Sequence, residues 1–378
     1  MFKFAQTLGD QLPASVVQPQ AGVESGAKLV EMVRRALEKP LDYPPLAEAI
    51  FPGDQVAIAV HPDVPSGARV AQSVIEFLLT HGVAAHDLTL VTARKMPVGF
   101  EDDLADLNQV VHDQHDENAV SYLAANQAGQ PVKINRNLFD ADVVIPITCR
   151  DQPATLNDIY PEFSCAETIQ RYHQQEDNEA EQRAEIRLAN EHLGLFIALN
   201  VVGGPGDDVH SVLFGEKERT DQVAETLAQK IWRVMPQDPV PLVIATIEDQ
   251  PENQTWEHFC RALMAAHDVS PGDGQMVICT DLEQMPDESM RQVLAMSFEE
   301  EELAVVSPDI EGVRPAMQRL INILRERQVF LLSGLADEEV EEMGLGPISH
   351  ADEFRRLVER ADQAILLRDA HKVVVSYP

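Results

Sequence analysis

The sequence predicts an α/β protein with two domains, each built around a largely parallel sheet with flanking helices, and with a cleft between the domains. Three observations lead to this prediction. The chain has 378 residues, which is enough for two to three domains of ordinary size. Short apolar runs of strand length alternate with helical stretches. A proline cluster, PQDPVP, interrupts that alternation and is the best candidate for a linker. We therefore expect an N-terminal domain at 1–235 and a doubly wound α/β domain at 241–378.

The N-terminal domain is expected to begin with an arm. Residues 1–50 carry prolines at positions 13, 19, 40, 44 and 45 and one helical stretch at 25–37, so we expect this arm to pack on the N-terminal domain. The apolar run at 55–60, the amphipathic stretch at 67–81 and the run at 88–92 follow. Strand, helix and strand with short links predict a right-handed parallel unit.

The rest of this domain is predicted to mix strands and helices. Residues 101–126 are rich in acidic and amide side chains and are expected to be helical with loops. An apolar strand follows at 142–147. Two more apolar runs flank the glycine-rich segment GGPGDD at 203–208, which predicts an antiparallel hairpin; a phosphate loop is the alternative, but no helix follows directly. A long helix is expected at 217–234.

The second domain alternates more regularly. Its expected strands are LVIAT, GQMVICT, QVFLLS and QAILL, and its expected helices are at 255–267, 310–327 and 351–361. Doubly wound sheets bind ligands beyond the carboxyl ends of their strands. We therefore expect the chemistry to lie there, in a cleft between the two halves.

Charge and composition exclude several classes of function. The chain has 63 acidic and 29 basic residues and a formal net charge of −34, without a basic patch, so neither nucleic acid nor a membrane surface is expected as a partner. No apolar run approaches the ~18 residues of a membrane helix, and the amino end lacks a secretory signal, so we expect a cytoplasmic protein. Four widely spaced cysteines without a CxxC pair fit neither a disulfide framework nor a structural zinc site.

The segment HPDVPSGAR, which leads from a predicted strand into a helix, carries the best ligand-binding pattern. Ser66 and Gly67 would offer free backbone N–H groups at the positive end of the helix dipole, with Arg69 one turn further. This arrangement suits a phosphate or carboxylate. In the alternative interpretation Ser66 only caps the helix and Arg69 lies in water. The common nucleotide-binding, serine-hydrolase and zinc-protease motifs are absent.

Three groups of histidines are candidates for chemistry. His112 and His115 bracket an aspartate in HDQHD, a spacing that suits a metal site or, alternatively, a solvated polar helix start. His173 lies one turn past the apolar Ile169 and is interpreted as a ligand or acid/base, or as a packed core histidine. His258 is interpreted as part of an amphipathic helix.

Several segments, in order along nearly the whole chain, resemble the nickel-dependent lactate racemase family. They are ALEKPLDYPPLAEAIFPGDQVAIAV, HGVAAHDLTLVTARKMP, HDQHDENAVSYLAANQAGQPVKINRNLFDADVVIPI, YPEFSCAETIQRYH, FIALNVV, NQTWEHFCRALMAAHDVSPGDGQMVICTDL and FLLSGL. The resemblance implies two α/β domains with a cleft between them. It also implies a nickel pincer nucleotide as cofactor. The family's racemases move a hydride between substrate C2 and the ring of that cofactor.

The same resemblance assigns roles to single residues. It places His173 on the family's nickel-ligand histidine and Lys95 on the position of an acid/base histidine. Asn157 takes the place of the tethering lysine, and an uncharged carboxamide cannot form that tether. The family's Asp-x-x-Arg-Pro loop is altered here and keeps Asp63. In the second domain, Arg261 takes the place of the lysine of a ligand-binding helix, with Glu257 in the place of its tyrosine.

The leading interpretation is a divergent member of this family that binds a small anionic metabolite or nucleotide in the cleft between the domains, with catalysis altered or lost. The predicted cofactor- or anion-binding residues are Asp63, Ser66, Gly67, Arg69, Asn157 and Arg261. The predicted catalytic residues are Lys95 and His173, and His173 is also the predicted metal ligand. In one alternative, the protein is a racemase or epimerase of a 2-hydroxy acid whose nickel pincer nucleotide is held noncovalently. In another, it is a structural or partner-binding remnant.

Overall fold

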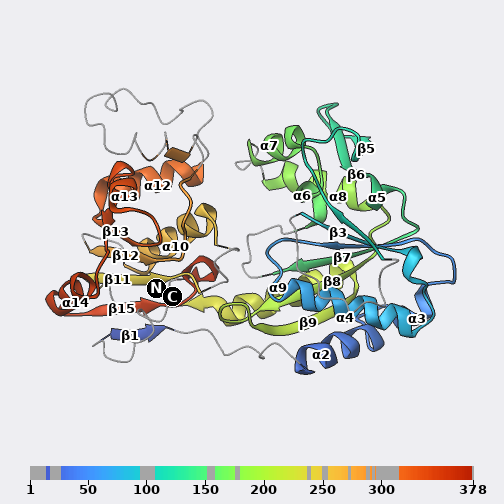
Figure 1. Cartoon of the computed structure of the whole chain (residues 1–378), viewed down its shortest axis with the longest axis horizontal. Coiled ribbons are helices and arrows are strands. Elements are labelled where there is room, and N and C mark those ends of the chain that lie inside the picture. Colours follow the sequence, from blue (N-terminus) through green and yellow to red (C-terminus); the bar gives the residue numbers. More distant parts are fainter. Residues whose placement is uncertain are drawn as a thin grey trace. The chain divides into compact units, whose positions relative to one another are not determined.

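The structure is a computed structural model of the chain, and it consists of two compact units, each treated by itself below (Figure 1). The amino-terminal unit comprises Ala21–Ala228, and the carboxyl-terminal unit combines Met1–Gln20 with Gln229–Pro378. The residues that the structure describes are 14–17, 27–93, 107–150, 158–174, 179–235, 240–248, 254–270, 274–286, 290–291, 294 and 315–376.

A six-stranded sheet organises the amino-terminal unit, in the order β4-β3-β2-β7-β8-β9. Its strands are β2 (Val56–Val60), β3 (Leu88–Thr92), β4 (Asn108–Val111), β7 (Val143–Cys149), β8 (Ile197–Gly203) and β9 (Val209–Glu216). The first five strands in that order run parallel, and β9 closes the edge antiparallel to β8, as predicted for the hairpin around the glycine-rich segment. All five residues of β2 are buried, as expected for a parallel strand covered on both faces.

Each face of this sheet has its own hydrophobic core. Because side chains alternate along a strand, Val56, Ile58 and Val60 enter one core, and Ala57 and Ala59 enter the other. The first core is covered by α2 (Ala27–Glu38), α3 (Leu46–Ala49) and α4 (Gly67–Thr80). The second is covered by the hairpin of β5 (Val120–Ala125) and β6 (Pro131–Asn135), and by α5 (Arg136–Phe139), α6 (Ile159–Glu162), α7 (Ala166–Gln174) and α8 (Glu179–His192). α9 (Lys217–Trp232) follows β9.

The prediction of helical structure at 101–126 is wrong for the described part of that range. β4 and β5 lie there instead. Both strands have exposed side chains: Asn108, Gln109 and Val111 are exposed at the edge of the large sheet, and Tyr122 is exposed in the hairpin. Polar side chains on such edges give the same composition as a solvated helix.

The carboxyl-terminal unit contains a second parallel sheet, in the order β1-β15-β11-β12-β13-β14. Its strands are β1 (Ala14–Val17), β11 (Leu242–Thr246), β12 (Gln275–Cys279), β13 (Val329–Leu332), β14 (Gly346–Pro347) and β15 (Ala364–Leu367). The helices of this unit include α10 (Trp256–Val269), α12 (Pro315–Glu326), α13 (Asp337–Glu342) and α14 (Ala351–Arg360), and a small sheet pairs β10 (Arg233–Val234) with β16 (Val374–Val375). The predicted fold class, α/β with largely parallel sheets and flanking helices, is confirmed.

The first strand corrects the prediction for the amino-terminal arm. In Figure 1 the blue strand β1 lies against the red strand β15, and the two are paired in parallel from Ala14 with Ala364 to Val17 with Leu367. The arm is therefore divided: its first described segment, β1, adds an edge strand to the sheet of the carboxyl-terminal unit, whereas α2 and α3 pack on the amino-terminal unit as predicted. None of the described helices is both long and apolar enough to cross a membrane.

The topology marks one place in the amino-terminal unit as a ligand-binding position. From β2 the chain continues to β3 and β4 on one side, and β7 and β8 lie on the other side. The strand order therefore reverses between β2 and β7. Open α/β sheets bind ligands at such a switch point, outside the carboxyl ends of the strands. The residues that follow β2 and β7 define the candidate site.

Candidate functional site

The loop after β2 starts directly beside β7. The backbone N–H of His61 donates a hydrogen bond to the carbonyl oxygen of Ile147, at 2.9 Å. The buried imidazole of His61 accepts a hydrogen bond at Nδ1 from the N–H of Asp63, at 3.2 Å. The loop is thus anchored on both sides of the switch point. It holds the half-buried Asp63 carboxylate at the carboxyl end of β2.

The start of α4 is already bound to a carboxylate. Ser66 has left-handed backbone angles (φ 51°, ψ 30°), and its N–H donates to Oδ1 of Asp207 at 2.6 Å, while its hydroxyl donates to Oδ2 at 3.1 Å. The N–H of Gly67 donates to the carbonyl of Val64 at 3.0 Å. The expectation of free N–H groups at these two residues is therefore wrong. Asp207 comes from the β8–β9 turn, and a carboxylate is favoured at this positive end of a helix.

Buried charges lie next to this loop, at the end of β7. The guanidinium of Arg150 is 3.2 Å from Oδ1 of Asp221, Oδ2 of Asp221 is 2.9 Å from Nζ of Lys217, and Nζ is 2.7 Å from Oδ2 of Asp158. The exposed fractions of the Arg150, Lys217 and Asp158 side chains are 10%, 9% and 3%. We call these four residues the ion chain. It joins the end of β7, the start of α9 and the start of α6.

Neutral polar side chains complete the surroundings of the ion chain. The hydroxyl of Thr148 donates to Oδ1 of Asn200 at 2.7 Å. The Asn200 amide donates in turn to Oδ1 of Asp221 at 2.8 Å and to the hydroxyl of Thr220 at 3.1 Å. Thr148, Asn200 and Thr220 are fully buried. Hydrogen bonds therefore connect β7, β8 and α9 around the Asp221 carboxylate.

The electrostatics keep the ion chain charged. Burial alone would raise the pKa of Asp158, but the charges of Lys217 and Arg150 hold that pKa below its ordinary value. Burial likewise lowers the pKa of Lys217, but Asp158 and Asp221 raise it above its ordinary value. Both shifts favour the charged forms, so Asp158 is a carboxylate and Lys217 an ammonium at neutral pH.

The structure places four of the predicted site residues on one stretch of the amino-terminal unit. Asp63 and Ser66 lie in the loop between β2 and α4, and Gly67 is the first residue of α4. Arg69 lies in the first turn of α4 and is exposed. The interpretation of Ser66 as a side-chain cap of α4 is also not met, because its hydroxyl donates to Asp207. That these four residues bind a cofactor or anion stays a prediction.

The remaining predicted site residues are Lys95, Asn157, His173 and Arg261. Lys95 and Asn157 lie outside the described residues, and for His173 only the backbone is described, in α7. Arg261 lies on α10 in the carboxyl-terminal unit and forms an ion pair with Glu257 one turn earlier. The roles predicted for these residues therefore stay predictions.

His112 is a structural histidine. It is buried, and its Nε2 lies 2.7 Å from the carbonyl oxygen of Ser164, so Nε2 carries the hydrogen. Its Nδ1 then accepts from the Asn135 amide at 3.0 Å. His115 is exposed in the turn after β4, which is not a helix start. Among the residues that the structure describes, no group of three or more His, Cys, Asp or Glu side chains could hold a metal ion.

His258 belongs to a buried pair of imidazoles in the carboxyl-terminal unit. Its ring centroid lies 4.6 Å from that of His371, and both residues are buried. Burial lowers the pKa of His371 well below its ordinary value, and the positive charges of His258, Lys372 and Arg261 lower it further. His371 is therefore neutral at physiological pH.

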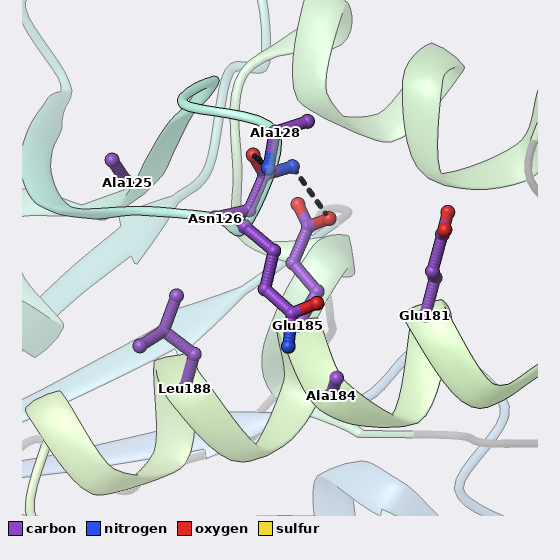
Figure 2. Close-up of a pocket in the computed structure, with 8 residues that line it drawn as sticks. Ala125, Asn126, Ala128, Glu181, Ala184, Glu185 and Leu188 are labelled. Carbon is purple, nitrogen blue, oxygen red and sulfur yellow. Dashed lines mark hydrogen bonds between the residues drawn. The ribbon is translucent and has the colours of Figure 1, made fainter.

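A pocket of about 260 Å³ lies away from the switch point, between α8 and the turn that joins β5 to β6 (Figure 2). It is lined by Ala125, Asn126, Gln127, Ala128, Glu181, Ala184, Glu185 and Leu188. Figure 2 shows the Asn126 amide joined to the Glu185 carboxylate, which also accepts from Tyr160 and Arg171. Burial alone would raise the pKa of Glu185, but these three donors hold it below its ordinary value. None of these lining residues belongs to the loops that follow β2 and β7, so this pocket is not the candidate site.

Comparisons with known proteins agree with this fold. Residues 3–149 match the family model of the lactate racemase N-terminal domain. The lactate racemase apoprotein from Thermoanaerobacterium thermosaccharolyticum has a similar structure, with a TM-score of 0.71 and 18% sequence identity over 95% of each chain. A Thermotoga maritima protein is similar with a TM-score of 0.65 and 14% identity, over 93% of this chain and 98% of that chain. No functionally curated protein matches the sequence.

Together, the two parallel sheets and the switch point between β2 and β7 define an α/β protein with the lactate racemase fold. The chain is lactate racemase-like in two respects: residues 3–149 match that family's N-terminal domain, and nearly the whole chain has the fold of a lactate racemase. The family resemblance predicted from the sequence is confirmed.

The ion chain was not predicted from the sequence. Its residues are far apart in the sequence, and each belongs to an ordinary-looking segment. One signal was present: Lys217 is the first residue of a helix, where the helix dipole disfavours a cation. A lysine at that position, with Asp221 one turn later, indicates that a local anion holds it there.

Proposed function

We propose that this protein binds a small anionic metabolite or nucleotide at the carboxyl ends of β2 and β7, and that lactate racemisation is altered or lost in it. The observation that carries the proposal is the switch point itself. The loop of Asp63 and Ser66 follows β2, and Arg150 follows the neighbouring strand β7. Sheets of this class bind their ligands at this position. Whether the carboxyl-terminal unit completes the site, as the predicted cleft requires, stays a prediction.

The preference for an anion is supported by the partner that Ser66 already has. Its N–H and hydroxyl hold the carboxylate of Asp207, at the positive end of α4. A carboxylate or phosphate group of a ligand would make the same hydrogen bonds. In this proposal the ligand displaces the Asp207 carboxylate, and the predicted binding residues Gly67 and Arg69 lie next to it on α4.

The loss of the family's reaction is supported by the residues at its catalytic positions. Asn157 has no amine with which to form a covalent tether. Lys95 takes the place of an acid/base histidine, and a lysine amine is ordinarily protonated at neutral pH, which makes it a poorer proton acceptor than an imidazole. His173 keeps the position of the nickel ligand. Among the described residues, no group of three or more His, Cys, Asp or Glu side chains is placed to hold a metal ion.

A second candidate function is favoured by the family match alone. In it, the protein is a racemase or epimerase of a 2-hydroxy acid, and His173 binds the nickel of a noncovalently held pincer nucleotide. Elemental analysis of protein purified from its native cells separates the two candidates. About one nickel per chain, with racemisation of L-lactate measured by polarimetry, would establish the second candidate and refute the loss of catalysis.

The binding proposal is tested by titration calorimetry with L-lactate, D-lactate, inorganic phosphate and nicotinic acid mononucleotide. At least one of these anions is expected to bind with a Kd below about 1 mM, and added salt should weaken the binding. The variant Asp207→Asn removes the competing charge and should bind the same anion more tightly. The neutral diol 1,2-propanediol is the control ligand. If neither the wild type nor Asp207→Asn binds any anion better than this diol, the proposal is wrong.

A further inference from the structure

Arg150 is fixed at the switch point by three neighbouring strands. It directly follows β7, which pairs with β2 up to Val60 and Ile147. Its backbone N–H donates to the carbonyl oxygen of Val201 in β8, at 3.0 Å. The backbone of Arg150 is thus held at the carboxyl edge of the sheet, beside the loop that begins at His61. This is the edge where the proposed ligand binds.

The side chain of Arg150 is oriented by a carboxylate that is itself immobilised. Oδ1 of Asp221 receives the Arg150 guanidinium at 3.2 Å and the Asn200 amide at 2.8 Å. Oδ2 of Asp221 receives Lys217 at 2.9 Å, and Lys217 is held by Asp158. The Asp221 carboxylate therefore has partners on both oxygens, and it holds one nitrogen of the guanidinium in place. Arginine presents five N–H donors in a rigid fork, so an oriented arginine can bind a planar carboxylate or a phosphate through two parallel hydrogen bonds.

Stability alone is a poor explanation for this arrangement. Lys217 is almost completely buried, and it stands at the first residue of α9, where the helix dipole repels a cation. The cost of removing charges from water offsets most of the attraction within a buried ion pair, and apolar residues of the same volume are often equally stable. An ion chain that holds a cation at the carboxyl edge of a sheet gives a fixed geometry that apolar residues would not give.

We propose that Arg150 determines specificity by binding the carboxylate or phosphate group of the ligand, and that Asp221 and Lys217 are positioning residues for its guanidinium. The inference rests on the proposed function and adds the residue that recognises the anion. Arg150 is separate from the residues that the sequence pattern assigned to binding. It recognises a bidentate oxyanion, so a carboxylate or phosphate is favoured over a spherical anion such as chloride.

The test uses the full-length protein and the tightest-binding anion of the calorimetric panel. Arg150→Met is expected to weaken binding by about 10- to 100-fold, the effect of a hydrogen-bonded charge. Arg150→Lys keeps the charge but loses the fork, and it should restore only part of the affinity. Asp221→Asn should weaken binding by a smaller factor. Lys230→Met, an exposed site near the other end of α9, is the matched control and should bind as the wild type does.

A double variant distinguishes positioning from a general structural role. If Asp221 acts only through Arg150, then Arg150→Met with Asp221→Asn binds no more weakly than Arg150→Met alone. Losses that multiply in the double variant would overturn the positioning role. All variants are compared below their unfolding temperatures. If Arg150→Met does not fold, the double variant takes its place, because it leaves no unpaired charge at either residue. The double variant should then bind the anion more weakly than Asp221→Asn does.

The outcomes separate this inference from the proposed function. If the wild-type protein and the variant Asp207→Asn bind none of the anions, the proposed function is wrong. If the wild type binds and folded Arg150→Met, or the double variant in its place, binds with unchanged affinity, the role of Arg150 is wrong and the proposed function stands.

Discussion

Replacing Lys217 with methionine tests the energetics of the ion chain directly. Methionine keeps most of the length of the side chain and removes its charge. The change takes away the ammonium that lies 2.7 Å from Asp158 and 2.9 Å from Asp221. Asp158 is 3% exposed, so water cannot replace the lost cation there, whereas Asp221 is 27% exposed and is partly solvated. The main effect therefore falls on Asp158.

The expected loss of stability follows from that burial. Removing one partner of a buried ion pair costs about 3–5 kcal/mol, because the other charge is left uncompensated. The sign of the pH dependence also follows. In the wild type the pKa of Asp158 is lowered. The Asp158 carboxylate therefore contributes fully to the free energy of unfolding above the ordinary pKa of 3.8, and this contribution is lost as the pH falls through the lowered pKa. Without Lys217, burial is expected to raise this pKa above 3.8, so lowering the pH favours the folded variant.

The assay is urea unfolding followed by far-UV circular dichroism at about pH 7 and about pH 4.5. Tryptophan fluorescence would report the other unit, since the chain's two tryptophans, Trp232 and Trp256, belong to it. Lys217→Met should be less stable than the wild type by about 3–5 kcal/mol at pH 7, and the difference should shrink at the lower pH. The control Lys230→Met should stay within about 0.5 kcal/mol of the wild type. A loss below about 1 kcal/mol at pH 7, as for an exposed pair, or a difference independent of pH, would refute the reasoning.

Three further outcomes are expected. Because the pKa of buried His371 is lowered, the unfolded chain binds one more proton than the folded chain below about pH 6.5. The free energy of unfolding should therefore decrease by up to about 1.4 kcal/mol for each pH unit by which the pH is lowered. His371→Gln should flatten this pH dependence in urea unfolding between about pH 8 and 5.5, and an unchanged dependence would contradict the explanation. A Cβ atom on Gly215 would lie 2.1 Å from the backbone oxygen of Leu41, so Gly215→Ala should unfold at a much lower temperature than Gly129→Ala, whose Cβ meets nothing within 4 Å. Finally, a net charge of −34 repels itself, so raising NaCl from about 0.05 to 1 M should raise the Tm measured by circular dichroism; a lower Tm would oppose this.

The parallel sheets could be predicted from the sequence because their strands are buried on both faces. β2 and β7 consist almost entirely of apolar residues, and such runs are distinctive at strand length. The prediction of helical structure at 101–126 was wrong for the opposite reason. β4 is an edge strand with mostly exposed residues, and the composition of such a strand does not distinguish it from a helix. The pairing of β1 with β15 joins segments at opposite ends of the chain, and local patterns hold no information about it.

The sequence allowed the loop of Ser66 to be placed between a strand and a helix, but not its partners to be identified. The loop of Ser66 was found because a strand leads directly into a helix there. Its partner Asp207 is 141 residues away in the sequence. Asp207 reaches Ser66 only because the strand order places β7 and β8 directly after β2. The ion chain was not predictable for the same reason. Arg150, Asp158 and Lys217 follow or precede different elements, and the fold alone brings them together.

The ion chain also bears on the substitution at Asn157. A tethering lysine is absent there, yet the amine of Lys217 lies 2.7 Å from the carboxylate of Asp158, the next residue in the sequence. This amine is not a replacement for the tether, because two aspartates raise its pKa and keep it an ammonium without a free electron pair. Positive charge is therefore present in this part of the protein without a reactive amine. That combination supports a protein that holds its ligand by charge and hydrogen bonds, and it argues against one that forms a covalent bond at this position.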